Sequence, residues 1–79
     1  MSKHSDVLEV VVKVVDNIYK NGIISYIAKT TIAFETGNIK VQFGEGYTRH
    51  SACQSSFDTA MSTLHIPVYQ LEGRVWFSD

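Results

Sequence analysis

The sequence has a single cysteine and a single proline among its 79 residues, and neither sign of charge is in clear excess. Because Cys53 has no second cysteine, an intramolecular disulfide and a multi-thiolate zinc site are both excluded. Seven Lys and Arg residues against eight Asp and Glu residues give a net charge of −1, which is too weak to gather nucleic acid or an anionic membrane by charge alone. What remains is one small domain, residues 1–79, with one core and marginal stability.

Long apolar runs are also missing. Glu9, Lys13 and Asp16 interrupt the valine-rich stretch near the N-terminus, so neither a signal peptide nor a membrane span is expected. No low-complexity tract, linker or internal repeat divides the chain. We therefore expect a soluble, cytoplasmic, single-domain protein.

Residues 6–21 are predicted to form a helix, because their apolar and polar side chains separate cleanly on a helical wheel. Asp6 with Glu9 forms a capping-box pattern, and Gly22 supplies a C-terminal stop. The apolar arc consists of Val7, Leu8, Val10, Val11, Val12, Val14, Val15, Ile18 and Tyr19. This arc spans about 200°, twice what one sheet covers, so the wheel predicts a homodimer with Val10 and Val14 in its interface.

A hairpin is the alternative for the same region. In it, residues 12–20 pair with residues 23–34 across Asn21-Gly22, the strongest short hairpin signal in the chain. The run of valines also favours strands over helices. The pattern leaves both structures open.

Residues 23–35 are predicted to form a long strand with one inward apolar face. That face holds Ile24, Tyr26, Ala28, Thr30, Ile32 and Phe34. The turn at residues 35–38 contains Gly37, and Ile39, Val41 and Phe43 then alternate with polar residues as a half-buried strand. Together these segments predict an antiparallel hairpin.

A second helix is predicted to begin near Ser51, with Gln54 completing a capping-box pattern, and to end before Pro67. Its buried stripe is Cys53, Phe57, Ala60, Met61 and Leu64. The tail, residues 68–77, is rich in strand formers. Gly73 is either a bulge in one tail strand or the corner of a short hairpin, and the pattern does not choose between them.

The expected element order is helix, strand, strand, helix and strand, with a further strand if Gly73 turns the tail. Helices bury their apolar sides most simply when they lie together on one face of a sheet. The sequence therefore predicts a two-layer α+β domain with two helices on one face of a small antiparallel sheet.

One segment, residues 44–51, has the composition of a ligand site. Gly46 permits close backbone approach, and Arg49, His50 and Ser51 stand at the start of the second predicted helix, where unpaired N–H groups favour anions. This arrangement indicates an anion or small-molecule site as the alternative function. The simpler explanation is a strand-to-helix turn, because the segment matches no phosphate-binding fingerprint.

Catalytic and metal-binding chemistry has little support in the sequence. Cys53 lies in the first turn of a predicted helix, but it also opens the apolar stripe, which favours core packing over nucleophilic chemistry. His4, His50 and His65 show no metal-ligand spacing. We expect no enzyme activity, no metal and no cofactor.

The aromatic tail suggests a protein interface instead. If the tail is a strand, Phe77 points inward and leaves Trp76 on the polar face beside Arg74. Trp and Arg are enriched in interface hot spots, whereas no lysines cluster there for a nucleic acid. We therefore expect a non-catalytic binding or regulatory protein that acts as a homodimer through protein contacts and has neither a nucleic-acid nor a membrane partner.

Overall fold

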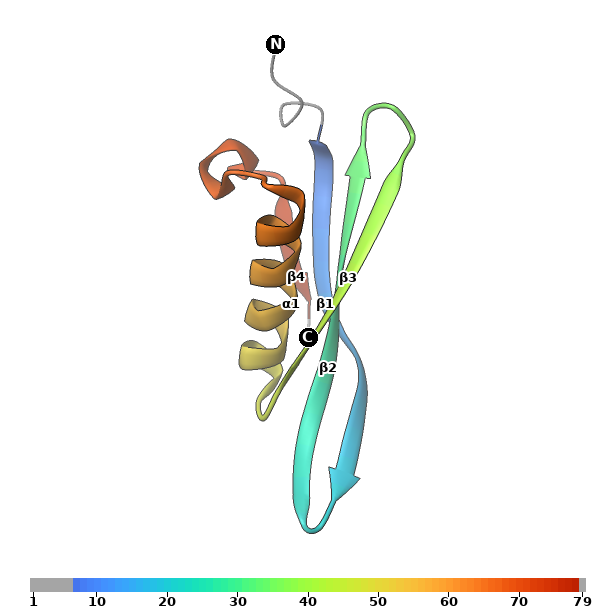
Figure 1. Cartoon of the computed structure of the whole chain (residues 1–79), viewed down its shortest axis with the longest axis vertical. Coiled ribbons are helices and arrows are strands. Elements are labelled where there is room, and N and C mark those ends of the chain that lie inside the picture. Colours follow the sequence, from blue (N-terminus) through green and yellow to red (C-terminus); the bar gives the residue numbers. More distant parts are fainter. Residues whose placement is uncertain (1–6, 79) are drawn as a thin grey trace.

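The computed structural model describes residues 7–78. In chain order, the elements are β1 (Val7–Lys20), β2 (Ile23–Phe34), β3 (Ile39–Gly46), α1 (Arg49–Leu64), a short 3-10 helix η2 (Val68–Leu71) and β4 (Val75–Ser78). The strands form one sheet in the order β3-β2-β1-β4, and α1 lies along one face of it (Figure 1). The α+β class is therefore confirmed, with one helix on a four-stranded sheet.

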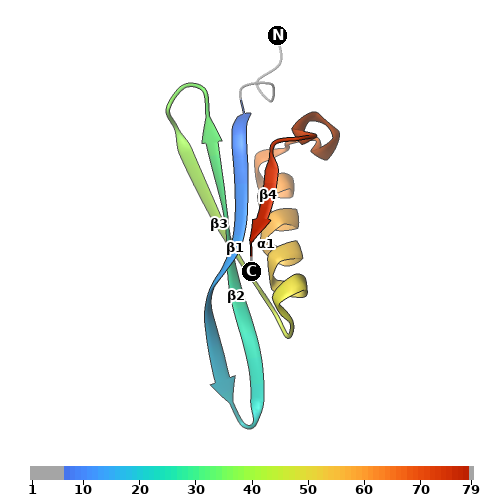
Figure 2. The same ribbon diagram turned by 180° about the vertical axis from the view of Figure 1, so that it is seen from behind.

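The sheet is mixed rather than antiparallel. The pairs β1–β2 and β2–β3 are antiparallel, but the chain crosses through α1 and returns so that β4 lies parallel to β1 (Figure 2). Gly73, at φ 80°, lies in the turn that leads from η2 into β4. The tail is thus one short strand that begins after the glycine, neither a bulged strand nor a hairpin.

The predicted helix over residues 6–21 is wrong, and the hairpin alternative describes the chain. Asn21 and Gly22 have φ angles of 54° and 77°, the left-handed conformations that a two-residue hairpin turn requires. Lys20 pairs directly with Ile23 across this turn. A local turn and a valine-rich strand together outweigh the helical wheel. Asp6 of the expected cap lies outside the described residues, and Glu9 lies within β1.

Irregularities in β1 explain why the wheel was misleading. The register with β2 shifts between Val7 and Glu9 and again between Val14 and Asp16. Each shift inserts an extra residue and resets the alternation of the strand. The residues that face α1 are therefore Val7, Val10, Val12 and Val14, with a spacing of three between Val7 and Val10 where a regular strand has two. A bulged strand thus imitated a helical pattern.

The hairpin of β1 and β2 extends past the N-terminal end of α1, where it forms a two-stranded arm (Figure 1). We call residues 18–25 the arm. It contributes to the elongated shape of the molecule, 50 × 20 × 19 Å.

Helix α1 begins two residues earlier than predicted. Thr48, not Ser51, is its N-cap, and its hydroxyl accepts a hydrogen bond from the Ser51 N–H at 3.0 Å. The helix ends at Leu64, where His65 adopts a left-handed conformation at φ 57°. The predicted apolar stripe is confirmed, since Cys53, Phe57, Ala60 and Met61 are buried and Leu64 packs against them.

The core lies between α1 and one face of the sheet. Its buried hydrophobic residues are Val7, Val10, Val12, Ala28, Ile32, Ala52, Cys53, Phe57, Ala60, Met61, Ile66 and Leu71. One buried polar pair crosses it, Thr30 Oγ1 to Ser56 Oγ at 2.8 Å. Because the Ser56 hydroxyl donates its proton to the Cys53 carbonyl, the Thr30 hydroxyl is the donor to Ser56. Phe77 also packs inward, with its ring centroid 5.7 Å from that of Phe57.

Two glycines let β3 approach α1 closely. A Cβ atom at Gly44 would lie 2.6 Å from the Ser56 Cα, and one at Gly46 would lie 2.7 Å from the Ala52 nitrogen. Neither distance is compatible with a side chain. The main chain of β3 therefore packs directly against the main chain of α1, and the even-numbered positions of β3 face the helix.

We expect Gly44→Ala to lower the free energy of unfolding by about 3 kcal/mol, the upper end for overpacking, because the new methyl meets helix backbone that cannot move aside. Gln42→Ala, on the same side of β3, is the control and is expected to cost less than about 1 kcal/mol. Urea denaturation of both variants measures the difference. Equal denaturation midpoints for Gly44→Ala and the parent protein would contradict the close packing.

Candidate functional site

The face of the sheet opposite α1 is covered by no other element of residues 7–78 (Figures 1 and 2). We call it the open face. Outward faces of antiparallel sheets are usually polar. The apolar residues of the open face are Val11, Ile27, Ala33, Ile39, Val41, Phe43 and Trp76, joined toward the arm by Ile18 and Ile23. The sheet is therefore hydrophobic on both sides.

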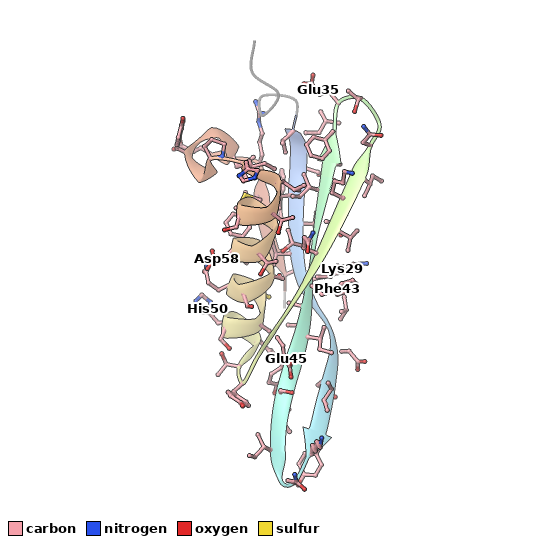
Figure 3. The ribbon with its side chains drawn as sticks, in the orientation of Figure 1. Lys29, Glu35, Phe43, Glu45, His50 and Asp58 are labelled. Atoms are coloured by element: carbon pink, nitrogen blue, oxygen red, sulfur yellow. The ribbon has the colours of Figure 1, made fainter. Side chains whose placement is uncertain are left out.

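Strand β3 makes the largest contribution to this surface. Ile39, Val41 and Phe43 were expected to be half-buried, yet they are 63%, 40% and 58% exposed. They point away from α1 because Gly44 and Gly46, an odd number of positions along the strand, must face it. Figure 3 shows Phe43 on the side of the sheet away from the helix, close to Lys29.

The register places the central residues of the open face in one row. Val41 pairs with Thr31, Thr31 with Val11, and Val11 with Trp76, so the row crosses all four strands. Directly paired side chains share a face and lie close enough to touch. Trp76, 52% exposed, is thus the end of a row that is apolar except for Thr31, and not an isolated aromatic residue.

Charged residues on the open face are mixed in sign. Lys13 pairs directly with Lys29, and Glu9, Asp16 and Glu45 lie on the same face at other positions along the strands. The face thus offers no surface of one sign that would select a polyanion.

A shallow hollow of about 340 Å³ lies where the open face meets the arm. It is lined by Ile18, Lys20, Asn21, Ile23, Ser25, Glu45 and Tyr47. The Ser25 hydroxyl donates to the Glu45 carboxylate at 3.1 Å. This hydrogen bond joins β2 to the end of β3, so the Glu45 carboxylate is already engaged in holding together two strands that line the hollow.

The predicted anion site is largely engaged in local structure. The Ser51 N–H donates to Thr48, the Ser51 hydroxyl accepts from the Thr48 N–H at 3.1 Å, and Gly46 packs against Ser51 and Ala52. The Arg49 guanidinium lies 5.3 Å from the centre of the Tyr26 ring, a cation–π contact that holds it against β2. His50 points away from the sheet (Figure 3). The four predicted residues therefore do not converge on a common point.

The predicted interface residues divide between the two faces. Trp76 lies on the open face, whereas Val10 is fully buried under α1 and Val14 packs against the same core. Arg74 donates from its guanidinium to the Val7 carbonyl at 2.9 Å, a contact that ties the start of β4 to the start of β1. Of these residues, Trp76 alone belongs to the open face.

Sequence reasoning missed the role of β3. Its alternating pattern shows one apolar and one polar face, but it does not say which face meets the helix. Gly44 and Gly46 share the phase of the polar residues Lys40 and Gln42. This coincidence was the available signal, since glycines in a strand mark close approach by another backbone.

Other chemical groups are not gathered into a site. Residues 7–78 hold no cluster of three or more His, Cys, Asp and Glu side chains placed to bind a metal ion, and His4 lies outside that range. Helices α1 and η2 both fall short of the length and apolarity that a membrane-crossing helix needs. No protein-family model, curated protein or solved structure matches the chain.

Cys53 is only 3% exposed, so we expect its thiol to react slowly with a disulfide reagent in the native protein and rapidly after denaturation. The rate ratio is measured by following the released chromophore in native buffer and in guanidinium. Equal rates in the two conditions would show that the thiol is accessible and would reopen its role as a nucleophile.

Proposed function

We propose that this chain is a non-catalytic binding protein that acts as a homodimer through protein contacts on its open face. The orientation of β3 is the observation that carries this proposal, because Ile39, Val41 and Phe43 project away from the chain's own core. Contiguous exposed apolar surface of this kind marks interaction sites in small proteins.

Burial of this face is energetically favourable. Apolar surface removed from water contributes about 25 cal/mol per Å². Phe43 and Trp76 are the large aromatic anchors that dominate interfaces of this kind. A domain of this size has one small core, so a second buried layer adds proportionally more to its stability than it adds to a large protein.

A protein partner suits the face better than a nucleic acid. Lysines and carboxylates are interspersed there, whereas a nucleic-acid surface needs cations that follow a phosphate backbone. The two lysines beside the row from Val41 to Trp76 are accompanied by carboxylates, whereas a base-stacking platform is accompanied by further cations.

We expect Phe43→Ser to weaken self-association by about thirtyfold or more, because the variant removes a central anchor. Sedimentation equilibrium over a range of concentrations measures the dissociation constant. Tyr69→Ser is the matched control, since Tyr69 is an aromatic residue on η2, away from the open face, and is more exposed than Phe43.

The parent protein is expected to sediment as a dimer and Tyr69→Ser to behave like it. A parent protein that sediments as one protomer at all concentrations would contradict the proposal. So would a Phe43→Ser variant that associates as tightly as the parent.

A further inference from the structure

The open face carries an unrelieved repulsion. Lys13 and Lys29 pair directly across β1 and β2 on this face. Like charges in such a position destabilise a strand pair. Neither lysine, nor the nearby Glu9, forms an ion pair within the described residues 7–78. The open face therefore presents two adjacent cations, with Glu9 on one side of them along the strands and Asp16 and Glu45 on the other.

These charges lie in rows on either side of the apolar row. Call Val41–Thr31–Val11–Trp76 the central row. The next outward row toward the arm is Phe43–Lys29–Lys13–Ser78. The next outward row away from the arm is Ile39–Ala33–Glu9. The two flanking rows are thus complementary to each other. Each has an apolar residue on β3, and the charges on β1 are opposite, Lys13 in one row and Glu9 in the other.

A twofold axis can bring two open faces together in few ways. If the axis runs along the strands between β1 and β2, Lys29 meets the partner's Lys13 and four lysines gather. If the axis runs across the strands along the row that contains Lys13 and Lys29, each of these lysines meets its own copy. Like-charge contacts of this kind exclude a pairing.

An axis along the central row avoids these clashes. It sets Phe43 over the partner's Ile39, Lys29 over the partner's Ala33, and Lys13 over the partner's Glu9. We propose that two copies of this chain pack open face to open face about this axis, with two reciprocal Lys13–Glu9 pairs on opposite sides of the central row. This proposal rests on the proposed function and names its interface.

The dimensions of the face suit such a dimer. Strands lie about 4.8 Å apart and rise about 3.3 Å per residue, so seven residues on each of three strands and the four residues of β4 give a face of about 400 Å². Two facing copies cover about 800 Å² of flat sheet before side-chain relief is counted, and this relief brings the buried area toward the roughly 1,000 Å² that a specific interface needs. The resulting aligned sandwich leaves both α1 helices outside.

Charge reversal tests the axis. We expect Lys13→Glu alone and Glu9→Lys alone each to weaken self-association by at least about a hundredfold, because each variant places like charges at two symmetric positions. An equimolar mixture of the two variants is expected to form a heterodimer, since every contact then joins a Glu to a Lys. The double variant carrying both changes is expected to recover the homodimer.

Lys40→Glu is the matched control, because it makes the same change of charge as Lys13→Glu but on the side of β3 opposite the open face. Circular dichroism melts at low concentration establish that every variant is folded. Sedimentation equilibrium measures each protein alone, and mass spectrometry of the mixture under non-denaturing conditions identifies the heterodimer by its mass.

Rescue in the mixture and in the double variant, with Lys40→Glu unaffected, supports the central-row axis. A parent dimer that Phe43→Ser disrupts but that both single reversals leave intact overturns this axis while preserving the open face as the interface. Loss of association without rescue also overturns the axis. A monomeric parent protein overturns the proposed function itself.

Discussion

The rest of the structure depends on the main-chain contact between Gly44 in β3 and Ser56 in α1. A side chain at position 44 would collide with the helix backbone, so the helix can approach only the glycine side of β3. Antiparallel pairing with β2 then sets the phase of every other residue in the strand. Ile39 and Phe43 consequently point away from the core. One close contact on the covered side of the sheet thus determines the chemistry of the uncovered side.

A sheet that is hydrophobic on both faces needs two covering layers, but residues 7–78 supply only α1. A second copy supplies the missing layer without any further element, because a twofold contact lets the same face serve as both surfaces. The mixed charges favour this solution, since a face that presents both signs can complement itself. A uniformly charged face could not, and would require a partner of the opposite sign.

Much of the fold was accessible from the sequence. The hairpin of β2 and β3 followed from alternation around Gly37, and the buried side of α1 followed from helical spacing through Phe57. The helix predicted over residues 6–21 was wrong because bulges at both ends of the buried stretch of β1 changed the period of its apolar residues. A bulge leaves no mark in the composition of a strand. The Asn21-Gly22 turn was the stronger indication, since its backbone requirement is local and does not depend on the period of the neighbouring strand.

The candidate site was less accessible, for a different reason. Trp76 could be assigned to the outer face because alternation within one short strand, opposite the inward Phe77, is local information. The opposition of Lys13 and Lys29 is not local, because it arises only when the register between two strands is known. The fold keeps this repulsive pair on an apolar surface, although a shift of one position in register would separate the two lysines. An anion brought there by association best explains the pair. Among the carboxylates of the open face, Glu9 is the one that lies across the central row from Lys13, two residues from Val11. Self-association therefore accounts together for the exposed apolar row and for the charges that flank it.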